Sequence, residues 1–221
     1  LGIPRVDRNV YARENGLVIT GLAALYAAGG DAGSIKDARR AAEWVMSHRA
    51  LPGGGFRHGE KDAAGPYLAD TLAMARAFLA LYTVTAERRW LARAEDAAAF
   101  MDSHFRNPLG FATAAAVSGA PLKSKPQVDE NIALVRFANL LHAHTGKAEH
   151  RAMAEHAMRY LASPVVVDLP GYGPSGILLP VLETRTAPAH TTVAAGKTDP
   201  ASRALFSTAL RNAPPVSATV W

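Results

Sequence analysis

Apolar residues along the first two thirds of the chain recur at helical spacing in three pairs of segments. The first segment of each pair is apolar on most sides, as in a helix surrounded by others; these segments are 12–28, 67–84 and 128–145. The second carries Ala and aromatic residues opposite Arg, Lys and Glu, which is typical of a helix with one solvated face; these segments are 34–48, 88–104 and 147–162. The pattern predicts three hairpins, each with a buried and an outer helix.

The three predicted hairpins are repeats of one unit. Tyr26, Tyr82 and His142 each end an apolar stretch, and they lie 56 and 60 residues apart. All three units have Ala at twelve and at fifteen residues after this marker. At eighteen residues after it, each has an aromatic residue: Trp44, Phe100 and Tyr160. A repeat of one buried and one amphipathic helix favours an α/α toroid or solenoid.

The last part of the chain follows a different pattern. A short helix is predicted after the third hairpin, followed by a strand, a helix that Asp199 caps and Pro200 begins, and a second strand. We therefore expect a mainly α chain. Its two parts would be a partial α/α toroid over residues 1–186 and a small strand–helix–strand unit over residues 187–221, packed on the toroid.

The connections between the predicted helices are unequal in length. Turns within a hairpin are short, whereas the loops between hairpins, 49–66 and 106–127, are long and contain several Gly and Pro residues. Antiparallel helices place all the long loops at one end of the domain. Because long loops on a rigid scaffold usually carry function, we expect the binding surface at that end.

The amino-acid composition excludes some classes of protein and some kinds of functional site. Hydrophobic residues make up 49% of the chain, which argues against disorder. The absence of Cys excludes disulfides, thiolate nucleophiles and Cys-based zinc sites. The eight His residues show no metal-binding spacing. Six of them are expected on the surface or at helix ends: His48, His104, His142, His144, His150 and His156. We therefore expect no metal and no cofactor.

The charge of the chain bears on its partners. A net charge of +5 would permit nucleic-acid binding. However, the Lys and Arg residues are mixed with Asp and Glu along the helices, which favours a solvated outer face, so no nucleic-acid partner is expected. No apolar run approaches the roughly 20 residues of a membrane span. A soluble protein of the cytoplasm or the periplasm is expected, and the lack of Cys does not choose between the two.

The repeat also marks a candidate site at the start of each buried helix. Twelve residues before the markers lie three acids: Glu14, Asp70 and Glu130. A small polar residue follows each of them. Acids near helix N-termini complement the helix dipole, and Asn or Thr can cap free N–H groups, so helix chemistry alone predicts these residues. In a toroid, however, these helix starts converge, and the three carboxylates would face one mouth.

Residues near these acids fit a sugar-binding cleft. Carboxylates bind hydroxyls and can serve as acid or base, and aromatic faces stack on sugar rings. We expect a sugar-like small molecule to meet Glu14, Asp70 and Glu130 as catalytic acids, with Asp70 the best candidate for the acid or base. The candidate substrate-binding residues around them are Arg13, Asn15, Phe56, His58, Tyr67, Phe111 and Asn131.

Several short motifs follow one another in a fixed order along nearly the whole chain. They are Asp7-Arg8-Asn9-Val10, Glu14-Asn15-Gly16-Leu17, Tyr67-Leu68-Ala69-Asp70, Gly110-Phe111, Glu130-Asn131 and Pro174-Ser175-Gly176. In this order they resemble the helical region of the thioredoxin-domain-containing, spermatogenesis-associated protein family. The chain departs from that family in having Glu14 where relatives tend to carry Trp. It also lacks the family's thioredoxin-like part, so no redox chemistry is expected of it.

The resemblance implies a six-hairpin α/α toroid akin to N-acylglucosamine 2-epimerases and helical-toroid glycosidases. Two functions stay open: a carbohydrate-active or carbohydrate-binding toroid domain, and a non-catalytic helical scaffold that docks a thioredoxin-like domain or partner. Whether the chain is an enzyme also stays open. Because three or four hairpins do not close a six-hairpin ring, either the other hairpins lie in a missing N-terminal part or the domain works as an open arc.

Overall fold

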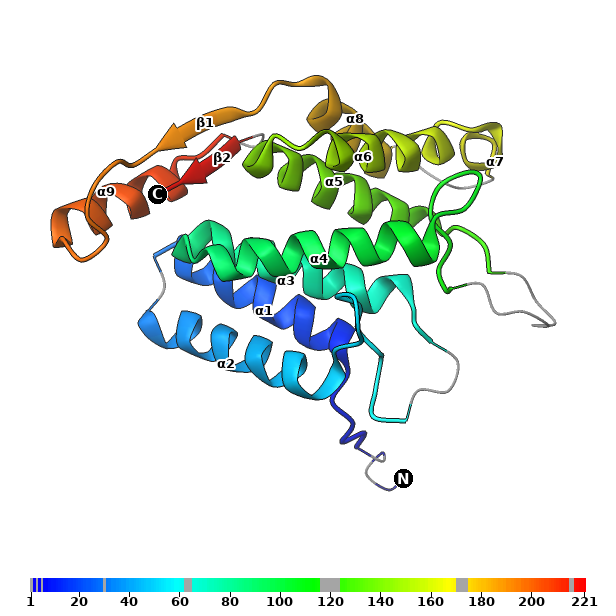
Figure 1. Ribbon diagram of the computed structural model, residues 1–221, viewed down its shortest axis with the longest axis horizontal. Coiled ribbons are helices and arrows are strands. Elements are labelled where there is room, and N and C mark those ends of the chain that lie inside the picture. The colour runs from blue at the N-terminus through cyan, green and yellow to red at the C-terminus, as the bar shows by residue number, and fades with distance from the viewer. Residues whose placement is uncertain are drawn as a thin grey trace.

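The computed structural model describes residues 2, 4, 6–29, 31–61, 65–115, 124–169, 175–214 and 217–221. Its first part consists of three antiparallel helical hairpins that follow one another in the chain (Figure 1). The hairpins are α1 (Ala12–Ala27) with α2 (Ala32–Arg49), α3 (Leu68–Thr85) with α4 (Arg88–Phe105), and α5 (Val128–Thr145) with α6 (Ala148–Leu161). All six helices predicted from the apolar pattern are present, and each end lies within two residues of the prediction.

Short-range chemistry accounts for several helix ends. Asp31 caps α2, because its Oδ1 accepts a hydrogen bond from the N–H of Ser34 at 3.0 Å. Helices α3 and α5 end at left-handed residues, Ala86 (φ 53°) and Gly146 (φ 68°), whose N–H groups donate back to the last helical turn. These tight turns keep the two helices of a hairpin antiparallel.

The hydrophobic core lies between the hairpins. Helix α1 packs closely along α3 because Gly16 has no side chain: a Cβ there would lie 2.6 Å from the carbonyl carbon of Ala73. Helix α5 packs on the other side of α3. The largest fully buried aromatic side chains are Trp90, Phe78, Phe105 and Phe111. Helices α1, α3 and α5 therefore form an inner layer, and α2, α4 and α6 pack outside it (Figure 1).

The burial of the inner helices differs from the prediction. Helix α3 is buried on most sides, as predicted, because α1 and α5 flank it. The prediction that every inner helix is more buried than its outer partner is wrong for α1 and α5, each of which turns one side away from the other hairpins. On α1 this leaves apolar side chains about half exposed: Leu17 (50%), Val18 (58%) and Leu25 (53%).

The C-terminal elements cover one side of the third hairpin and the far ends of the inner helices. They are α7 (Pro164–Val167), α8 (Ser175–Arg185), β1 (Ala189–Thr192), α9 (Pro200–Arg211) and β2 (Ser217–Val220). The two strands pair in parallel, with Ala189 opposite Ser217. Lys197 donates to the carbonyl of Ala86 at 2.9 Å and so ties this part to the turn between α3 and α4. The strand–helix–strand order is as predicted; the division into residues 1–186 and 187–221 stays a prediction.

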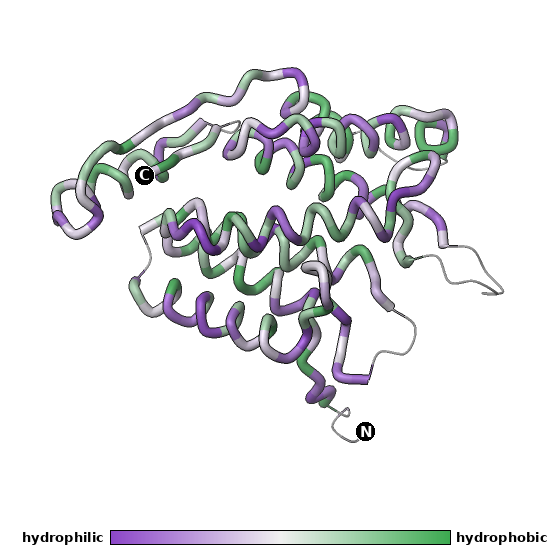
Figure 2. The backbone as a smooth tube through the Cα atoms, in the orientation of Figure 1, coloured by the Kyte–Doolittle hydropathy of each residue, from purple (hydrophilic) through white to green (hydrophobic). Residues whose placement is uncertain are grey.

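Hydropathy along the chain follows this layering (Figure 2), with many hydrophilic residues on α2. Among the described helices, only α3 is long and apolar enough to cross a membrane by length and composition, with a mean hydropathy of 1.2 over residues Leu68–Thr85. The core helix of a globular domain passes the same test, and 67% of this window is buried within the protein.

Candidate functional site

The starts of the three inner helices lie at one end of the molecule. The N-terminal ends of α1, α3 and α5 face the right-hand side of Figure 1, where the described parts of the two long loops also lie. The fold thus brings the candidate acids to the long-loop end. The amino ends of helix dipoles point there as well, which favours negative charge at this surface.

Asp70 is the most deeply buried of the three acids, with 1% of its surface exposed. Its Oδ1 accepts a hydrogen bond from the backbone N–H of Arg13 at 3.0 Å and lies 2.9 Å from Nδ1 of His58. Burial raises the pKa of Asp70, and the bonds from His58 and Arg13 act in the opposite direction. Asp70 therefore forms a carboxylate–imidazole pair in a desolvated setting.

The His58 ring is held between two tyrosines. It stacks on Tyr11 with ring centroids 4.3 Å apart and planes 14° apart, and it meets the edge of Tyr67 at 6.5 Å. The side chain of His58 is 37% exposed. Of the pair, His58 is therefore the member that a ligand at this surface can touch, and Asp70 lies behind it.

Glu130 is the second partly buried acid. Its Oε1 accepts a hydrogen bond from the hydroxyl of Thr113 at 2.8 Å, whereas its Oε2 is buried and has no hydrogen-bond partner among the described residues. Burial is the main cause that raises the pKa of Glu130, and the nearby charge of Asp70 adds to it. A buried acceptor without a partner costs free energy, so Glu130 is an unsatisfied group at this end of the fold.

Each long loop joins two inner helices in the same way. The carbonyl of His58 accepts from the N–H of Ala12 at 3.0 Å, and the carbonyl of Thr113 accepts from the N–H of Leu68 at 2.9 Å. Each loop residue thus binds the start of one inner helix through its backbone. Through its side chain it binds the acid of the next inner helix. His58 and Thr113 occupy the same repeat position, two residues after the Phe of each Gly-Phe pair.

Asn131 holds a loop and has no atom free for a ligand. It is fully buried, its Oδ1 accepts from the N–H of Phe111 at 2.9 Å, and its Nδ2 donates to the carbonyls of Phe111 and Gln127. Thr71, at the same repeat position on α3, accepts from the N–H of Phe56 at 3.1 Å. These bonds pull the Gly-Phe part of each loop into the core.

The two loop phenylalanines are consequently core residues. Phe56 is 3% exposed and Phe111 is 0% exposed. Phe56 packs against Phe78, and Phe111 meets the edge of His156. The expectation that both rings line the mouth is wrong, because neither ring leaves a face open on which a sugar could stack.

The remaining candidates stay at the surface. Glu14 and Arg13 are exposed at the start of α1, and the charge of Glu14 contributes to the raised pKa of Asp70. The charge of Arg13 acts to lower the pKa of Glu130. Asn15 is half-buried and donates to the carbonyl of Tyr11 within its own helix start. Electrostatic effects therefore link Glu14 to Asp70, and both Arg13 and Asp70 to Glu130.

The histidines differ from the prediction in part. His48 and His104 are exposed at the ends of α2 and α4, as predicted. His150 and His156 are buried at 6% exposure each. His150 lies at a helix end, in the first turn of α6, whereas the prediction of a surface or helix-end position is wrong for His156. His156 lies within 3.0 Å of the carbonyls of the Gly110 turn, which explains its burial. Among the residues that the structure describes, no three His, Asp or Glu side chains are grouped to hold a metal ion.

Two residues of this site were not found from the sequence. Tyr11, which stacks on His58, precedes the first predicted helix and was not among the candidate residues. Thr113, which binds Glu130, is an ordinary loop residue in the sequence. The signal that identifies both is alignment of the units: Tyr11 matches Tyr67 at the helix caps, and Thr113 matches His58 in the loops.

The chain resembles known proteins in structure rather than in sequence. No family model matches the sequence, and no curated protein matches it by sequence. Solved structures do match, among them an α-mannanase of glycoside hydrolase family 76 from Bacteroides thetaiotaomicron, with a TM-score of 0.59 and 15% identity over 72% of this chain and 45% of that chain. A sugar epimerase from a ruminal bacterium matches with a TM-score of 0.60 and 14% identity over 70% and 44% of the two chains.

A third solved structure, the cellobiose 2-epimerase of Spirochaeta thermophila, matches with a TM-score of 0.51 and 18% identity over 81% of this chain and 44% of that chain. The chain has an α/α-toroid fold. It spans less than half the length of these three neighbours, and identities this low show the fold alone. The toroid part of the family resemblance is thus supported, whereas the thioredoxin-domain-containing family is not shown by these matches.

Proposed function

We propose that this toroid arc binds a carbohydrate at its long-loop end and can carry out acid–base chemistry on it. The observation that carries the proposal is the pair of buried Asp70 and partly exposed His58, with Oδ1 and Nδ1 2.9 Å apart. A carboxylate that orients an imidazole is a common acid–base arrangement in enzymes. The structural neighbours, an α-mannanase, a sugar epimerase and a cellobiose 2-epimerase, support a sugar as the ligand.

The residues take different roles in this proposal. His58 contacts the sugar and exchanges a proton with it, and Asp70 is the positioning residue that fixes the imidazole. Asp70 was expected to be the acid or base itself, but its 1% exposure favours action through His58. Glu130 offers its unpartnered Oε2 to a ligand hydroxyl. Glu14 and Arg13 at the rim and Tyr67 beside His58 complete the polar surface.

Binding is tested by NMR titration of the isotope-labelled chain with mannobiose and with cellobiose. The proposal expects shifts of the backbone amide signals at the starts of α1, α3 and α5. Asp70→Asn should weaken the binding at least about tenfold, because a neutral amide holds the imidazole less firmly than a carboxylate does. The matched control is Asp37→Asn on the exposed face of α2, which should bind as the unmodified chain does.

Two results would overturn the proposal. One is the absence of any shift with either sugar at millimolar concentration. The other is equal weakening by both substitutions. Either result would favour the alternative of a non-catalytic scaffold for a thioredoxin-like partner, which a titration with thioredoxin would then examine.

A further inference from the structure

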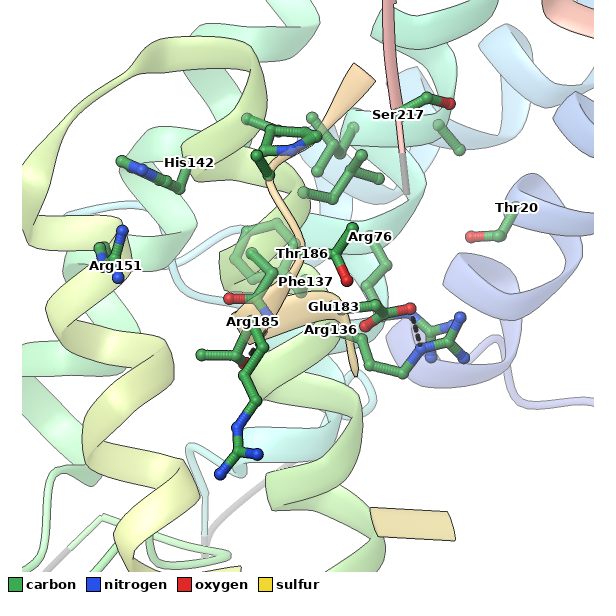
Figure 3. A pocket seen from close by; sticks show the side chains of 18 residues that line it. Thr20, Arg76, Arg136, Phe137, His142, Arg151, Glu183, Arg185, Thr186 and Ser217 are labelled. Carbon is green, nitrogen blue, oxygen red and sulfur yellow. Dashed lines mark hydrogen bonds and ion pairs between the residues drawn. The ribbon is translucent and has the colours of Figure 1, made fainter. Parts of the chain in front are cut away.

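A cavity of about 480 Å³ lies apart from the candidate site, between α3, α5, the end of α8 and the segment that leads into β1 (Figure 3). None of the residues that line it belongs to the candidate sugar site. Its lining carries one acid, Glu183 of α8, and four arginines: Arg76 of α3, Arg136 of α5, Arg151 of α6 and Arg185 of α8. A half-buried cavity with this many charges needs a physical explanation.

The repeat places one polar residue of each inner helix on this wall. Thr20, Arg76 and Arg136 each lie six residues after the acid that begins the helix, and all three line the cavity. Six residues correspond to about 9 Å along a helix. Below the layer of acids at the long-loop end there is thus a second layer, at one repeat position, in which the charged residues are cations.

The charges in this second layer do not cancel. Arg136 donates to Oε1 of Glu183 at 3.0 Å, as the dashed line in Figure 3 shows. Arg76 makes no hydrogen bond or ion pair with any described residue, although it is partly buried. Burial and the neighbouring charge of Arg136 lower the pKa of Arg76, and Glu183 acts in the opposite direction. Arg151 pairs with Glu155, which does not line the cavity. Arg76 and the exposed Arg185 are therefore the lining cations without an acidic partner among the described residues.

Glu183 adds a second unsatisfied group. Its side chain is 11% exposed, and its Oε2 is buried without a hydrogen-bond partner among the described residues. This oxygen can only accept a hydrogen bond, so it lacks the donor that it requires. The cavity therefore presents a free guanidinium fork for an anion and a free carboxylate oxygen for a hydroxyl.

We infer that this cavity binds a small hydroxylated carboxylate, with a sugar acid such as a uronate as the fitting class. The planar guanidinium of Arg76 matches a carboxylate in a bidentate pair. A ligand hydroxyl donates to Oε2 of Glu183. Because the carboxylate of Glu183 can only accept, the cavity favours a ligand that carries hydroxyl donors as well as a carboxylate. A volume of 480 Å³ lies within the range of small-ligand sites, about 300 to 1,000 Å³. The inference does not rest on the sugar site at the long-loop end.

Isothermal titration calorimetry with glucuronate, glucose and inorganic phosphate tests the inference on the full chain. Glucuronate should bind, and Arg76→Met should weaken its binding at least about tenfold, since a charge-assisted bidentate contact is lost. Arg40→Met, on the exposed face of α2, is the matched control and should bind glucuronate normally. Asp70→Asn should also leave this binding unchanged, which separates the cavity from the candidate sugar site.

Thermal unfolding distinguishes loss of the site from loss of the fold. Because Arg76 has no partner within the described protein, Arg76→Met should melt at the same temperature as the unmodified chain or at a higher one. Failure of glucuronate to bind, or equal binding by the Arg76→Met variant, would overturn the inference. Binding of phosphate in preference to glucuronate would overturn the assignment to sugar acids.

Discussion

Glu130 and Asn131 are adjacent in the sequence, yet they do opposite things at the start of α5. Both the oxygen and the nitrogen of the Asn131 side-chain amide form hydrogen bonds to the backbone of Phe111 in the loop. In contrast, Glu130 has one buried oxygen without a hydrogen-bond partner among the described residues. Natural proteins satisfy nearly all buried polar groups, so an unsatisfied one next to a fully satisfied one points to a ligand or to stored strain. Substitutions at Asn131 and at Glu130 can therefore separate the contribution to stability from the contribution to binding.

Asn131→Ala should destabilise the fold strongly. The substitution leaves the N–H and the carbonyl of Phe111 buried without partners, which should cost about 2 to 4 kcal/mol in the free energy of unfolding. Urea denaturation measures this loss. Asn15→Ala is the matched control, because Asn15 holds the same repeat position with a single bond to its own helix, and it should cost less than about 1 kcal/mol. Equal losses of unfolding free energy in the two variants would show that the hydrogen bonds from Asn131 to Phe111 add nothing to stability.

The raised pKa of Glu130 predicts a pH dependence of folding. The folded chain keeps this proton to a higher pH than the unfolded chain, whose carboxyl titrates near 4.5. Between that value and the raised folded pKa, the folded state binds more protons, so stability falls as pH rises. Above that window the penalty of the buried charge is present in full. Asp70, whose pKa is also raised, contributes a slope of the same sign.

Glu130→Gln should remove its part of this slope. Urea denaturation from pH 4 to pH 7 should then show a smaller fall of the unfolding free energy than in the unmodified chain, since the buried group no longer ionises. Glu149→Gln, at an exposed position on α6, serves as the control and should keep the original slope. An unchanged slope in Glu130→Gln would contradict the assignment of a raised pKa.

These residue-scale roles were only partly predictable from the sequence. The repeat identified Glu14, Asp70 and Glu130, because equivalent positions of repeated helices meet at one end. It could not separate Asp70, which lies behind His58, from an acid in contact with solvent, because that depends on how the loop closes over the helix start.

At the element scale, the Gly-Phe turns of the long loops are packed by the outer helices. Gly55 approaches the ring of Phe100, and Gly110 approaches Tyr160, so that a Cβ at residue 110 would lie 2.7 Å from the Cβ of Tyr160. Phe100 and Tyr160 are thus equivalent in packing, as the repeat predicted. Trp44, the third member, is only half-buried and stacks on His48.

Gly110→Ala should be more damaging than an ordinary left-handed glycine substitution. Gly110 has φ 77°, and its new Cβ would also lie 2.9 Å from Oδ1 of Asn131, so we expect a loss of about 2 to 4 kcal/mol. Gly146→Ala has the same backbone strain (φ 68°) in open space and should cost about 1 kcal/mol. Thermal or urea unfolding of both variants isolates the packing clash, and equal losses would refute it.

Phe100→Ala tests the equivalence of the repeat aromatics. Phe100 is 4% exposed, and its truncation should cost about 3 to 5 kcal/mol in the free energy of unfolding. Trp44→Ala should cost less, because Trp44 is half-buried. A denaturation midpoint that is unchanged in Phe100→Ala would show that this side chain does not pack between the helices.

Helix positions were predictable because apolar periodicity is a local property of the sequence. The burial of α1 and α5 was not, because it depends on which helices lie beside them. The loop phenylalanines were misplaced for a similar reason: Phe56 and Phe111 stand in Gly-rich loops, yet side-chain bonds from Thr71 and Asn131 draw them into the core.

At the scale of the whole molecule, the chain is an arc of α/α toroid that places acids at one end of its inner helices. About 9 Å along them, α3 and α5 carry arginines and α1 carries Thr20. The acids meet because equivalent helix starts face the same end. If they were three independent helix caps, backbone N–H groups would stabilise each charged carboxylate and lower its pKa. If they share one desolvated site, burial and mutual repulsion raise the pKa instead.

Carboxyl titration by NMR on the full chain distinguishes these two arrangements. We predict that Asp70 and Glu130 both titrate above their ordinary values, and that Asp70→Asn lowers the pKa of Glu130, because the charge of Asp70 is one of the causes that raise it. If both acids titrate below their ordinary pKa values and the pKa of Glu130 does not respond to the loss of the Asp70 charge, the acids do not share one desolvated site.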